Sequence, residues 1–451
     1  MKILIAGAGK VGATMVRQLS DSDLEIVLID NDKEALEANC ERYDVMGLLG
    51  NCASVPVLEE AGVAQADLLI AATSLDEVNL LCCATAHHLN PRLHTIARVR
   101  DPEYSDEIFT LKEFFGLSMT INPEQTAAEE IASLIRYPAF LQRDRFAKGK
   151  VEIVELQVEE NSPMCHVALK DLSRVAGCRV LVCAVIRDGK SVSPGGSFVL
   201  EAGDRIEVTA PASNLNKMLR HLGFITVKPR RVILCGGGKV SYYLSRRLIT
   251  NGIEVQIIDS DPERCRTLAE SLPEVSVICG DATDKELLEK EGLSSCDALV
   301  TLTGRDEINV LISLYARSRG VPQVITKQSD TGRFAILGEL PLGAVISPKE
   351  LCSNAIVQYV RTFRDQSGDT PVSVQPIADG AAQACEFLIR DDEPHQNIPL
   401  KDLKLKPGIL IAAVTRGRST MIADGASSFK GGDSVIVVAG SELLHFRDIF
   451  A

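Results

Sequence analysis

The chain has 451 residues, of which 45% are hydrophobic and 24% are charged, proportions that are typical of soluble globular proteins. Its formal net charge of −13 at pH 7 excludes a nucleic-acid partner, because binding to a phosphate backbone requires clustered Lys and Arg. The 13 Cys residues form no Cys-x-x-Cys pair, so the sequence predicts reduced thiols and no metal site. Cys183, Cys235 and Cys279 lie within apolar runs and are expected to be buried.

Residues 1–140 alternate short apolar strands with helical stretches. In chain order, strands are predicted at residues 2–8, 25–30, 45–50, 67–73, 94–99 and 117–123. Strands separated by helices of about 10–15 residues form right-handed βαβ units and therefore a parallel sheet. The segment is predicted to be an α/β domain of the Rossmann-like, doubly wound type.

The first predicted strand leads into a Gly-x-Gly-x-x-Gly turn made of Gly7, Gly9 and Gly12. In such a motif the first glycine permits the tight turn, the second lets the backbone approach a pyrophosphate, and the third lets helix and strand pack closely. The helix that follows offers unpaired N–H groups to the phosphates. Asp30 ends the second strand, where it would accept hydrogen bonds from a ribose and repel a 2′-phosphate. NAD or another adenine nucleotide is therefore favoured over NADP.

Other candidate residues follow from the fold, because ligands lie across the carboxyl ends of parallel strands. Arg98 ends the fifth strand, where its charge would face the phosphates; the alternative is an ordinary surface charge. The candidate nucleotide-binding residues of this domain are Gly7, Ala8, Gly9, Lys10, Val11, Gly12, Asp30, Asn51, Cys52, Thr73, Ser74 and Arg98.

The pattern changes from residue 145. Residues 151–158 alternate polar and apolar residues, as in a strand. Asp188 and Gly189 lie between two apolar runs, which is a hairpin signal. A turn leads into a further strand at residues 203–208. The segment 145–225 is therefore predicted to be a small α+β lobe with an antiparallel sheet.

The whole arrangement occurs twice. At an offset of 229 positions, the glycine turn and the acidic residue reappear as Gly236, Gly238 and Asp259. Such a period is too long for a solenoid and indicates a duplicated pair of domains. The second pair is expected at residues 230–365 and 370–451. Ser241 replaces the third glycine, and a slightly displaced helix would accommodate it.

The second copy is predicted to bind a nucleotide as well; the alternative is a vestigial element of the fold. Lys327 corresponds to Arg98, and both are cations at a strand end in an otherwise acidic protein. The candidate residues of the second site are Gly236, Gly237, Gly238, Lys239, Val240, Asp259, Asp281, Ala282, Thr303 and Lys327.

No catalytic constellation accompanies the predicted nucleotide. A dehydrogenase needs a proton-transferring group and substrate clamps in a second domain. Residues 145–225 contain neither a His–Asp pair nor a Cys–His arrangement, and His166 has no counterpart in the repeat. No catalytic residues are assigned. Binding without chemistry is favoured over the alternative, an NAD-dependent oxidoreductase that uses the first Rossmann domain.

These motifs together carry a resemblance to a known family. "GNC" or "GDAT" follows the third strand, "DEVNLL" or "DEINVL" follows the fourth, and a small lobe then contains "GDRIEV" or "GDSVIV". This order, present twice over nearly the whole chain, resembles the peripheral subunits of Trk-type potassium uptake systems. That family is built of RCK modules (regulators of potassium conductance), each with a Rossmann lobe (RCK-N) and a C-terminal lobe (RCK-C).

The resemblance implies a cytoplasmic regulatory subunit, peripheral on the inner face of the cell membrane. Its partner would be an integral-membrane Trk-type potassium-translocating subunit, gated as a ring of RCK modules changes shape on binding a ligand. NAD(H) would bind the Rossmann lobes, with ATP or ADP as further ligands at one or both. The ring would be a homo-oligomer, a tetramer with eight modules. Two residues depart from the family pattern: Asn51, where an acidic residue is usual, and Ser241.

Two further expectations concern contacts outside the nucleotide sites. The segments 127–141 and 352–363 follow the two Rossmann domains with helical apolar periodicity, and they are predicted to cross onto a neighbouring module of an obligate oligomer. A role for the small lobes as a receptor for a cyclic dinucleotide is compatible with the regulatory function, although no motif supports it.

Overall fold

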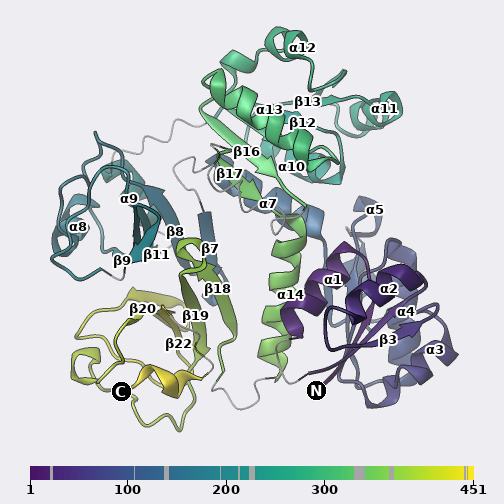
Figure 1. Ribbon diagram of the computed structural model, residues 1–451, viewed down its shortest axis with the longest axis horizontal. Coiled ribbons are helices and arrows are strands. Elements are labelled where there is room, and N and C mark those ends of the chain that lie inside the picture. Colours follow the sequence, from purple (N-terminus) through teal and green to yellow (C-terminus); the bar gives the residue numbers. More distant parts are fainter. Residues whose placement is uncertain are drawn as a thin grey trace. The chain divides into compact units, whose positions relative to one another are not determined.

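The computed structural model describes all residues except 21–23, 106, 137–141, 193, 212–213, 223–228, 330–339, 341, 365–369, 441–442 and 444. The chain folds into two units, each built from both halves of the sequence (Figure 1). Unit 1 comprises Met1–Ile135 and Pro229–Val357, and unit 2 comprises Arg136–Lys228 and Gln358–Ala451. Both copies of the predicted Rossmann lobe therefore belong to unit 1, and both small lobes belong to unit 2.

The first Rossmann lobe has a six-stranded parallel sheet in the order β3-β2-β1-β4-β5-β6. Its strands are β1 (Lys2–Ala6), β2 (Glu25–Asp30), β3 (Met46–Leu49), β4 (Leu68–Ala71), β5 (His94–Arg98) and β6 (Met119–Ile121). Its helices are α1 (Lys10–Leu19), α2 (Lys33–Cys40), α3 (Val55–Glu60), α4 (Asp76–Leu89), α5 (Pro102–Ser105), α6 (Ile108–Leu111) and α7 (Pro123–Arg136). All four residues of β4 are buried, as expected for a parallel sheet covered on both faces.

The second Rossmann lobe repeats this topology as β14-β13-β12-β15-β16-β17. Its strands are β12 (Arg231–Cys235), β13 (Glu254–Asp259), β14 (Ser276–Cys279), β15 (Ala298–Thr301), β16 (Gln323–Lys327) and β17 (Ala344–Ile346). Its helices are α10 (Lys239–Thr250), α11 (Pro262–Ser271), α12 (Lys285–Lys290), α13 (Asp306–Ser318) and α14 (Pro348–Arg364). The predicted tandem of doubly wound lobes is confirmed.

All 13 thiols are free, as predicted, but one expectation about their burial is wrong. Cys183 and Cys235 are buried, whereas Cys279 is exposed. Cys279 ends β14, an edge strand of its sheet, so no further strand covers it on the outer side. An apolar run therefore did not guarantee a buried thiol at this position.

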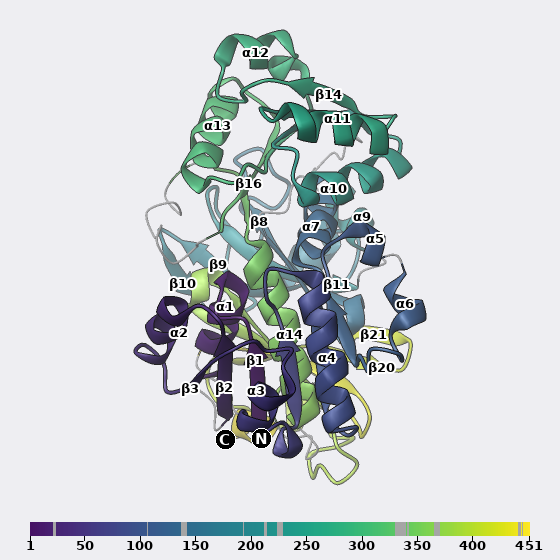
Figure 2. The same ribbon diagram turned by 90° about the vertical axis from the view of Figure 1, so that its right-hand side faces the viewer.

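Helices α7 and α14 are exchanged between the two Rossmann lobes (Figure 2). On α7, Glu129 accepts a hydrogen bond from Arg247 of α10 at 2.7 Å. On α14, Asn354 accepts one from Gln18 of α1 at 2.9 Å. The predicted crossing is present, but each helix meets the other module of the same chain. For the described part of segments 127–141 and 352–363, this crossing is no argument for a second copy of the protein.

Unit 2 contains two five-stranded antiparallel sheets, in the orders β10-β9-β11-β8-β7 and β18-β19-β22-β20-β21. The first consists of β7 (Gln142–Phe146), β8 (Val151–Gln157), β9 (Leu181–Arg187), β10 (Lys190–Val192) and β11 (Arg205–Pro211), with helices α8 (Leu169–Val175) and α9 (Leu215–His221). The second consists of β18 (Ser373–Ile377), β19 (Ala382–Leu388), β20 (Ile409–Arg416), β21 (Ser419–Ile422) and β22 (Ser434–Ala439). Asp188 and Gly189 join β9 to β10 with positive φ, as a two-residue hairpin turn requires.

The two small lobes share one hydrophobic core, and this explains a misleading pattern in the sequence. Phe146 and Ile153 of the first lobe pack in one cluster with Ile377 and Ile436 of the second. Glu152 and Glu155 are three residues apart and so lie on opposite faces of β8, yet each is only 3% exposed. Only Glu155 shares the face of Ile153 that packs on the second lobe. Arg143 and Arg205 pair with these two carboxylates.

A third carboxylate, Glu207 of β11, lies directly across the strand from Glu155 and is 1% exposed. Its Oε1 accepts a hydrogen bond from the N–H of Ala378, in the second small lobe, at 3.0 Å. Burial, followed by the charge of Glu155, raises the pKa of Glu207 to about 8. Asp144 raises this pKa further, and Arg205 and the N–H of Ala378 oppose the shift.

This arrangement predicts that unit 2 loses stability as the pH rises. An unfolded glutamate titrates near pKa 4.3, so between about pH 4.3 and about pH 8 the folded chain holds the extra proton. The stabilisation that this extra proton provides is fully present below about pH 4.3. The free energy of unfolding then falls across the window, by at most about 1.4 kcal/mol per pH unit. Glu207→Gln should remove most of this dependence, which urea titrations at about pH 5 and about pH 8 would measure. An unchanged pH dependence would contradict the assignment.

Candidate functional site

The two glycine turns have the backbone geometry that the motif requires. Gly7 has a φ of +108°, and a Cβ there would lie 2.9 Å from the carbonyl carbon of Ala72. Gly236 has a φ of +111° and the same conflict, at 2.7 Å, with Leu302. At Gly9 and Gly238 a Cβ would meet nothing within 4 Å, which leaves open space where phosphates are expected. Helices α1 and α10 begin directly after these glycines, and no side chain caps their first N–H groups.

The third position of the motif differs between the lobes. A Cβ on Gly12 would lie 1.8 Å from the carbonyl oxygen of Gly7, so α1 packs against its turn as only glycine allows. In the second lobe, the hydroxyl of Ser241 donates a hydrogen bond to the carbonyl oxygen of Gly236. Ser241 is fully buried. The serine is thus accommodated because its own hydroxyl forms a hydrogen bond with a carbonyl oxygen of the turn.

The acidic residues at the ends of β2 and β13 hold the turns as well as facing the expected ribose position. Asp30 accepts hydrogen bonds from the N–H groups of Ala8, at 2.5 Å, and Asp32, at 2.8 Å. Asp259 accepts the equivalent bonds from Gly237, at 2.6 Å, and Asp261, at 2.8 Å. Removing either carboxylate would therefore disturb the backbone as well as a ligand.

A difference between the two carboxylates was missed by the sequence reasoning. Arg264 of α11 lies 3.2 Å from Oδ2 of Asp259, whereas Ala35 stands at the corresponding position of the first lobe, 229 residues earlier. Asp259 is consequently charge-paired, and no ion pair joins Asp30 to another described residue. Comparison of the two copies at positions 35 and 264 could have found this residue.

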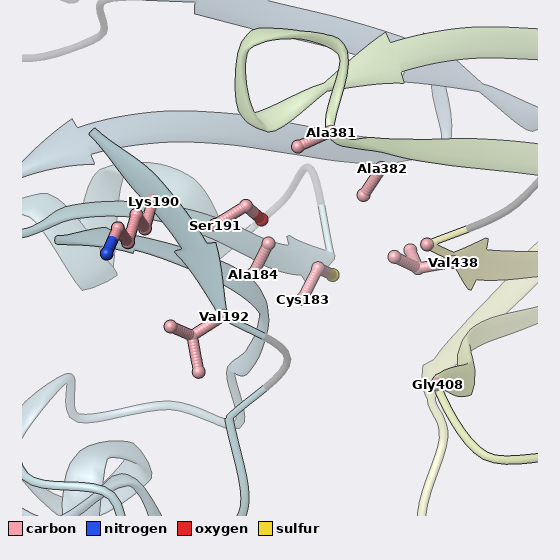
Figure 3. Close-up of a pocket in the computed structure, with 10 residues that line it drawn as sticks. Cys183, Ala184, Lys190, Ser191, Val192, Ala381, Ala382, Gly408 and Val438 are labelled. Carbon is pink, nitrogen blue, oxygen red and sulfur yellow. The ribbon is translucent and has the colours of Figure 1, made fainter.

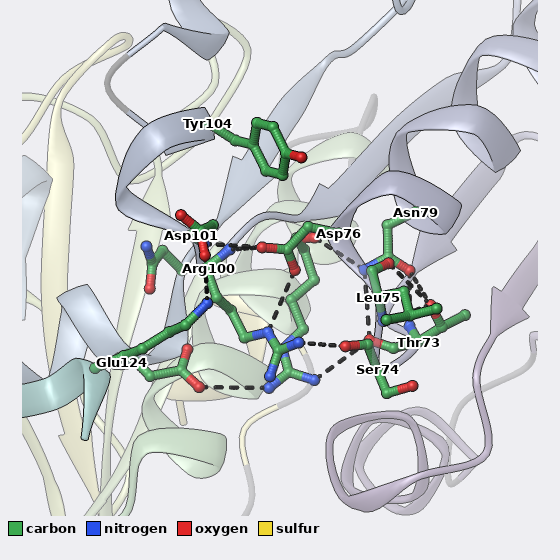
Figure 4. A network of polar contacts seen from close by, with 12 residues as sticks. Thr73, Ser74, Leu75, Asp76, Asn79, Arg100, Asp101, Tyr104 and Glu124 are labelled. Carbon is green, nitrogen blue, oxygen red and sulfur yellow. Dashed lines mark hydrogen bonds and ion pairs between the residues drawn. The ribbon is translucent and has the colours of Figure 1, made fainter. Parts of the chain in front are cut away.

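The "DEVNLL" and "DEINVL" motifs fix the ends of strands, and Figure 4 shows the first of them. The side-chain oxygen of Asn79 accepts hydrogen bonds from the N–H and the hydroxyl of Thr73, and its amide donates to the carbonyl of Arg98. Asp76 accepts hydrogen bonds from the N–H groups of Arg100 and Asp101. Asn309 repeats the role of Asn79 at Thr303 and Lys327. These positioning residues were not predicted. The same residue types occur at the corresponding positions of both copies, and this repetition could have indicated them.

The residues that follow the third strand of each sheet mostly serve the fold. Cys52 and Ala282 are buried in the cores of their lobes, so only their backbones could meet a ligand. Asn51 accepts a hydrogen bond from the N–H of Ala53, and Asp281 accepts one from Thr283. Both side chains thus stabilise local turns. Ser74 contributes its carbonyl oxygen, which accepts from Arg100.

Arg98 and Lys327 are not ordinary surface charges. Arg98 lies 3.5 Å from Oε1 of Glu124, and its side chain is 14% exposed. The Lys327 ammonium donates to the carbonyl of Leu302 at 3.2 Å, and burial lowers the pKa of this lysine. Both line a cavity of about 410 Å³ together with the first residues of α1 and α10. Asp30 and Asp259 do not line it.

A second cavity, of about 460 Å³, lies between the two small lobes (Figure 3). Cys183 and Ala184 line it from the first lobe, and Ala382 and Val438 line it from the second. Lys190 is its one charged lining residue among those described. The hypothesis of a cyclic dinucleotide at the small lobes stays a prediction. Among the described residues there is no cluster suited to a metal ion and no helix long and apolar enough to cross a membrane.

Two Rossmann lobes with glycine turns, joined to two antiparallel small lobes, define a tandem RCK-type protein. The TrkA-N domain matches residues 3–123 and 232–348, and the TrkA-C domain matches residues 153–223. The chain is 31% identical to the Trk system potassium uptake protein TrkA of Haemophilus influenzae over 446 residues, which is 97% of this chain and 95% of that protein. It is 31% identical to the TrkA homolog of Archaeoglobus fulgidus over the full length of both. The chain belongs to the TrkA family.

Solved structures show the same fold. The GsuK RCK domain superposes with a TM-score of 0.63 at 17% identity, covering 97% of this chain and 92% of that one. The GsuK channel bound to NAD gives a TM-score of 0.63 at 17% identity, covering 97% and 76%. These structures confirm the predicted fold class. The family matches confirm the predicted resemblance to Trk-type peripheral subunits.

Proposed function

We propose that this protein is the nucleotide-binding regulatory subunit of a Trk-type potassium uptake system. In this function it attaches to the cytoplasmic face of a membrane-embedded potassium-translocating subunit and gates it. The observation that carries the proposal is the presence, in one TrkA-family chain, of two glycine turns, each with open space above its second glycine. Two such sites in one folded unit can convert binding into a change of shape.

The ligands that we propose are NAD(H) at the first lobe and NAD(H), ATP or ADP at the second. Asp30 is the basis for the first assignment, because its carboxylate keeps a lone pair for a ribose hydroxyl on each oxygen. At the second lobe Arg264 competes for the same lone pairs of Asp259. The two sites therefore differ in what they can offer the adenosine half of a ligand.

We propose further that the protein carries out no reaction. Neither His nor Cys is among the described residues that line the cavity at the glycine turns, and its one carboxylate, Glu124, is paired with Arg98. A ligand shifts a two-state protein only through its different affinity for the two states, and a hundredfold difference is about 2.7 kcal/mol per site. Several coupled sites can shift a gate without consuming the ligand.

The proposed assembly is a homo-tetramer whose eight modules form a ring. Leu81 of α4 and Leu311 of α13 are 55% and 61% exposed and occupy corresponding positions in the two copies. Repeated exposed leucines support contacts between chains. Light scattering on the purified protein tests this assembly, and a monomer throughout the micromolar range would contradict it.

Potassium flux in reconstituted vesicles tests the function. Vesicles that contain a Trk-type translocating subunit should show a flux that responds to NADH, ATP or ADP only when this protein is added. Flux that ignores nucleotide would contradict the proposal. Steady oxidation of NADH by the purified protein in the presence of a metabolite would instead favour the oxidoreductase alternative.

Asp30→Asn is expected to weaken binding of NADH to the first lobe by roughly tenfold to a hundredfold. Asparagine keeps an acceptor for the N–H of Ala8 but loses the charge that strengthens hydrogen bonds to the ribose, each of which contributes about 1.5–3 kcal/mol before losses. Calorimetry measures the dissociation constant. The matched variant Asp259→Asn should leave binding at the first lobe unchanged. An equal effect of both variants at the first lobe would contradict the assignment.

A further inference from the structure

The cavity of about 410 Å³ in unit 1 is lined by both Rossmann lobes. Lys10 and Val11, at the start of α1, contribute from the first lobe, and Gly238 and Lys239, at the start of α10, contribute from the second. The two lobes are tied together beside it, because Lys239 lies 2.9 Å from Asp101 and the hydroxyl of Tyr243 donates to the carbonyl of Arg100. The first residues of the two helices that follow the glycine turns therefore line the same cavity.

The lining carries a large excess of positive charge in a protein whose formal net charge is −13. Its cations are Lys10, Arg98, Arg100, Lys239, Lys327 and Lys349, and its one carboxylate among the described residues is Glu124. Neighbouring carboxylates pair with Arg98, Arg100 and Lys239. No ion pair within the described part of the chain neutralises Lys10, Lys327 or Lys349. The charges of Asp306 and Glu124 oppose only part of this excess, at Lys327. A lining with one dominant sign of charge favours the binding of an anion.

The excess arises where the two copies differ. Glu124 is the second residue of α7 and Lys349 is the second residue of α14, so the two occupy corresponding places on the exchanged helices. The first copy thus pairs its strand-end cation, Arg98, with a carboxylate, whereas the second copy carries Lys349 at the place of Glu124, in the same lining as Lys327. In addition, Nε of Arg98 is shielded from solvent and has no hydrogen-bond partner among the described residues.

We propose that this cavity is a single phosphate site shared by the two lobes, and that it binds the polyphosphate chain of a dinucleoside polyphosphate. This inference rests on nucleotide binding by both lobes. One adenosine would point towards Asp30 and the other towards Asp259. Each glycine turn of this kind holds a pyrophosphate, so a ligand that occupies both turns needs about four phosphates.

One bridging ligand suits the site better than two separate nucleotides. Two mononucleotides would bring two phosphate groups, each with an additional terminal charge, into one cavity, where these groups would repel each other. A polyphosphate that carries an adenosine at both ends lacks those terminal charges. Once one adenosine is bound, the second binds intramolecularly at a high effective concentration, which can raise the affinity by about 10²–10⁴.

Calorimetry with diadenosine tetraphosphate and the full chain tests the proposal. We expect one molecule bound per chain, with an affinity at least about a hundredfold above that of ADP, which should bind at two molecules per chain. Lys349→Glu should weaken the tetraphosphate at least about tenfold more than it weakens NADH. Lys285→Glu, at an exposed lysine on α12, is the matched control and should change neither.

Two molecules of the tetraphosphate per chain, or an affinity no greater than that of ADP, would overturn the shared site. In either case, binding of NADH or ADP by the same sample leaves the regulatory function standing. Failure of the chain to bind any of these nucleotides would overturn both proposals. Because the first measurement uses the unaltered protein, it does not depend on the folding of a variant.

Discussion

Gly9→Asp is expected to abolish nucleotide binding at the first lobe while the protein remains folded. Gly9 has a φ of −69°, which any residue adopts, and a Cβ there meets nothing within 4 Å. The position precedes α1, where aspartate is among the best capping residues, so the helix itself should be at least as stable. The new carboxylate would, however, occupy the space of the pyrophosphate and repel it, and such like-charge contacts cost several kcal/mol.

The expected result is a loss of affinity for NADH at the first lobe of about a hundredfold or more, with an unchanged melting temperature. Gly238→Asp is the matched variant at the second lobe, and it should weaken binding there more than at the first lobe because Gly238 has the same open surroundings. In reconstituted vesicles, the double variant should give a potassium flux that no longer responds to nucleotide. Binding of NADH to Gly9→Asp with normal affinity would exclude the glycine turn as the phosphate site.

Gly12→Ala is expected to damage the first lobe itself. A Cβ at this position would lie 1.8 Å from the carbonyl oxygen of Gly7, so α1 would have to move away from its turn. Overpacking of this kind typically costs about 1–3 kcal/mol and occasionally more. Because the displaced helix carries the N–H groups that face the phosphates, affinity for nucleotide should fall together with stability.

Ser241→Gly, the reciprocal change, should be milder and should preserve the second site. It removes the hydrogen bond to Gly236 and adds the flexibility of a glycine within a helix, each of which costs about 1 kcal/mol. Urea denaturation and nucleotide titration of both variants measure the contrast. If Gly12→Ala were as stable as the unaltered protein, the close approach of α1 to its turn would be refuted.

Much of the fold was predictable because its signals are local. The apolar runs that became β1 and β4 are buried on both faces, and Asp188 and Gly189 specify a two-residue turn between neighbours in sequence. The offset of 229 residues then carried each element of the first copy to the second. The glycine turns were found for the same reason, since closely spaced glycines directly after a strand indicate a phosphate-binding turn.

What could not be predicted depends on residues that are distant in sequence. The burial of Glu155 and Glu207 follows from the packing of one small lobe on another, which strand alternation does not encode. The same holds for Lys349, whose place in the cavity depends on the exchange of α14. Cys52 was a candidate because it follows a strand, yet the turn directs its side chain into the core.

The exchange of α7 and α14 has a consequence for the ancestry of the chain. Neither Rossmann lobe is complete by itself, because each receives a helix from the other. A gene that encoded one module would therefore have produced a protein that folds in pairs, and pairing must have preceded the fusion. Joining the two genes made the partner permanent. From then on each half could accumulate its own substitutions, such as Ser241 and Lys349, because its partner was no longer an identical module.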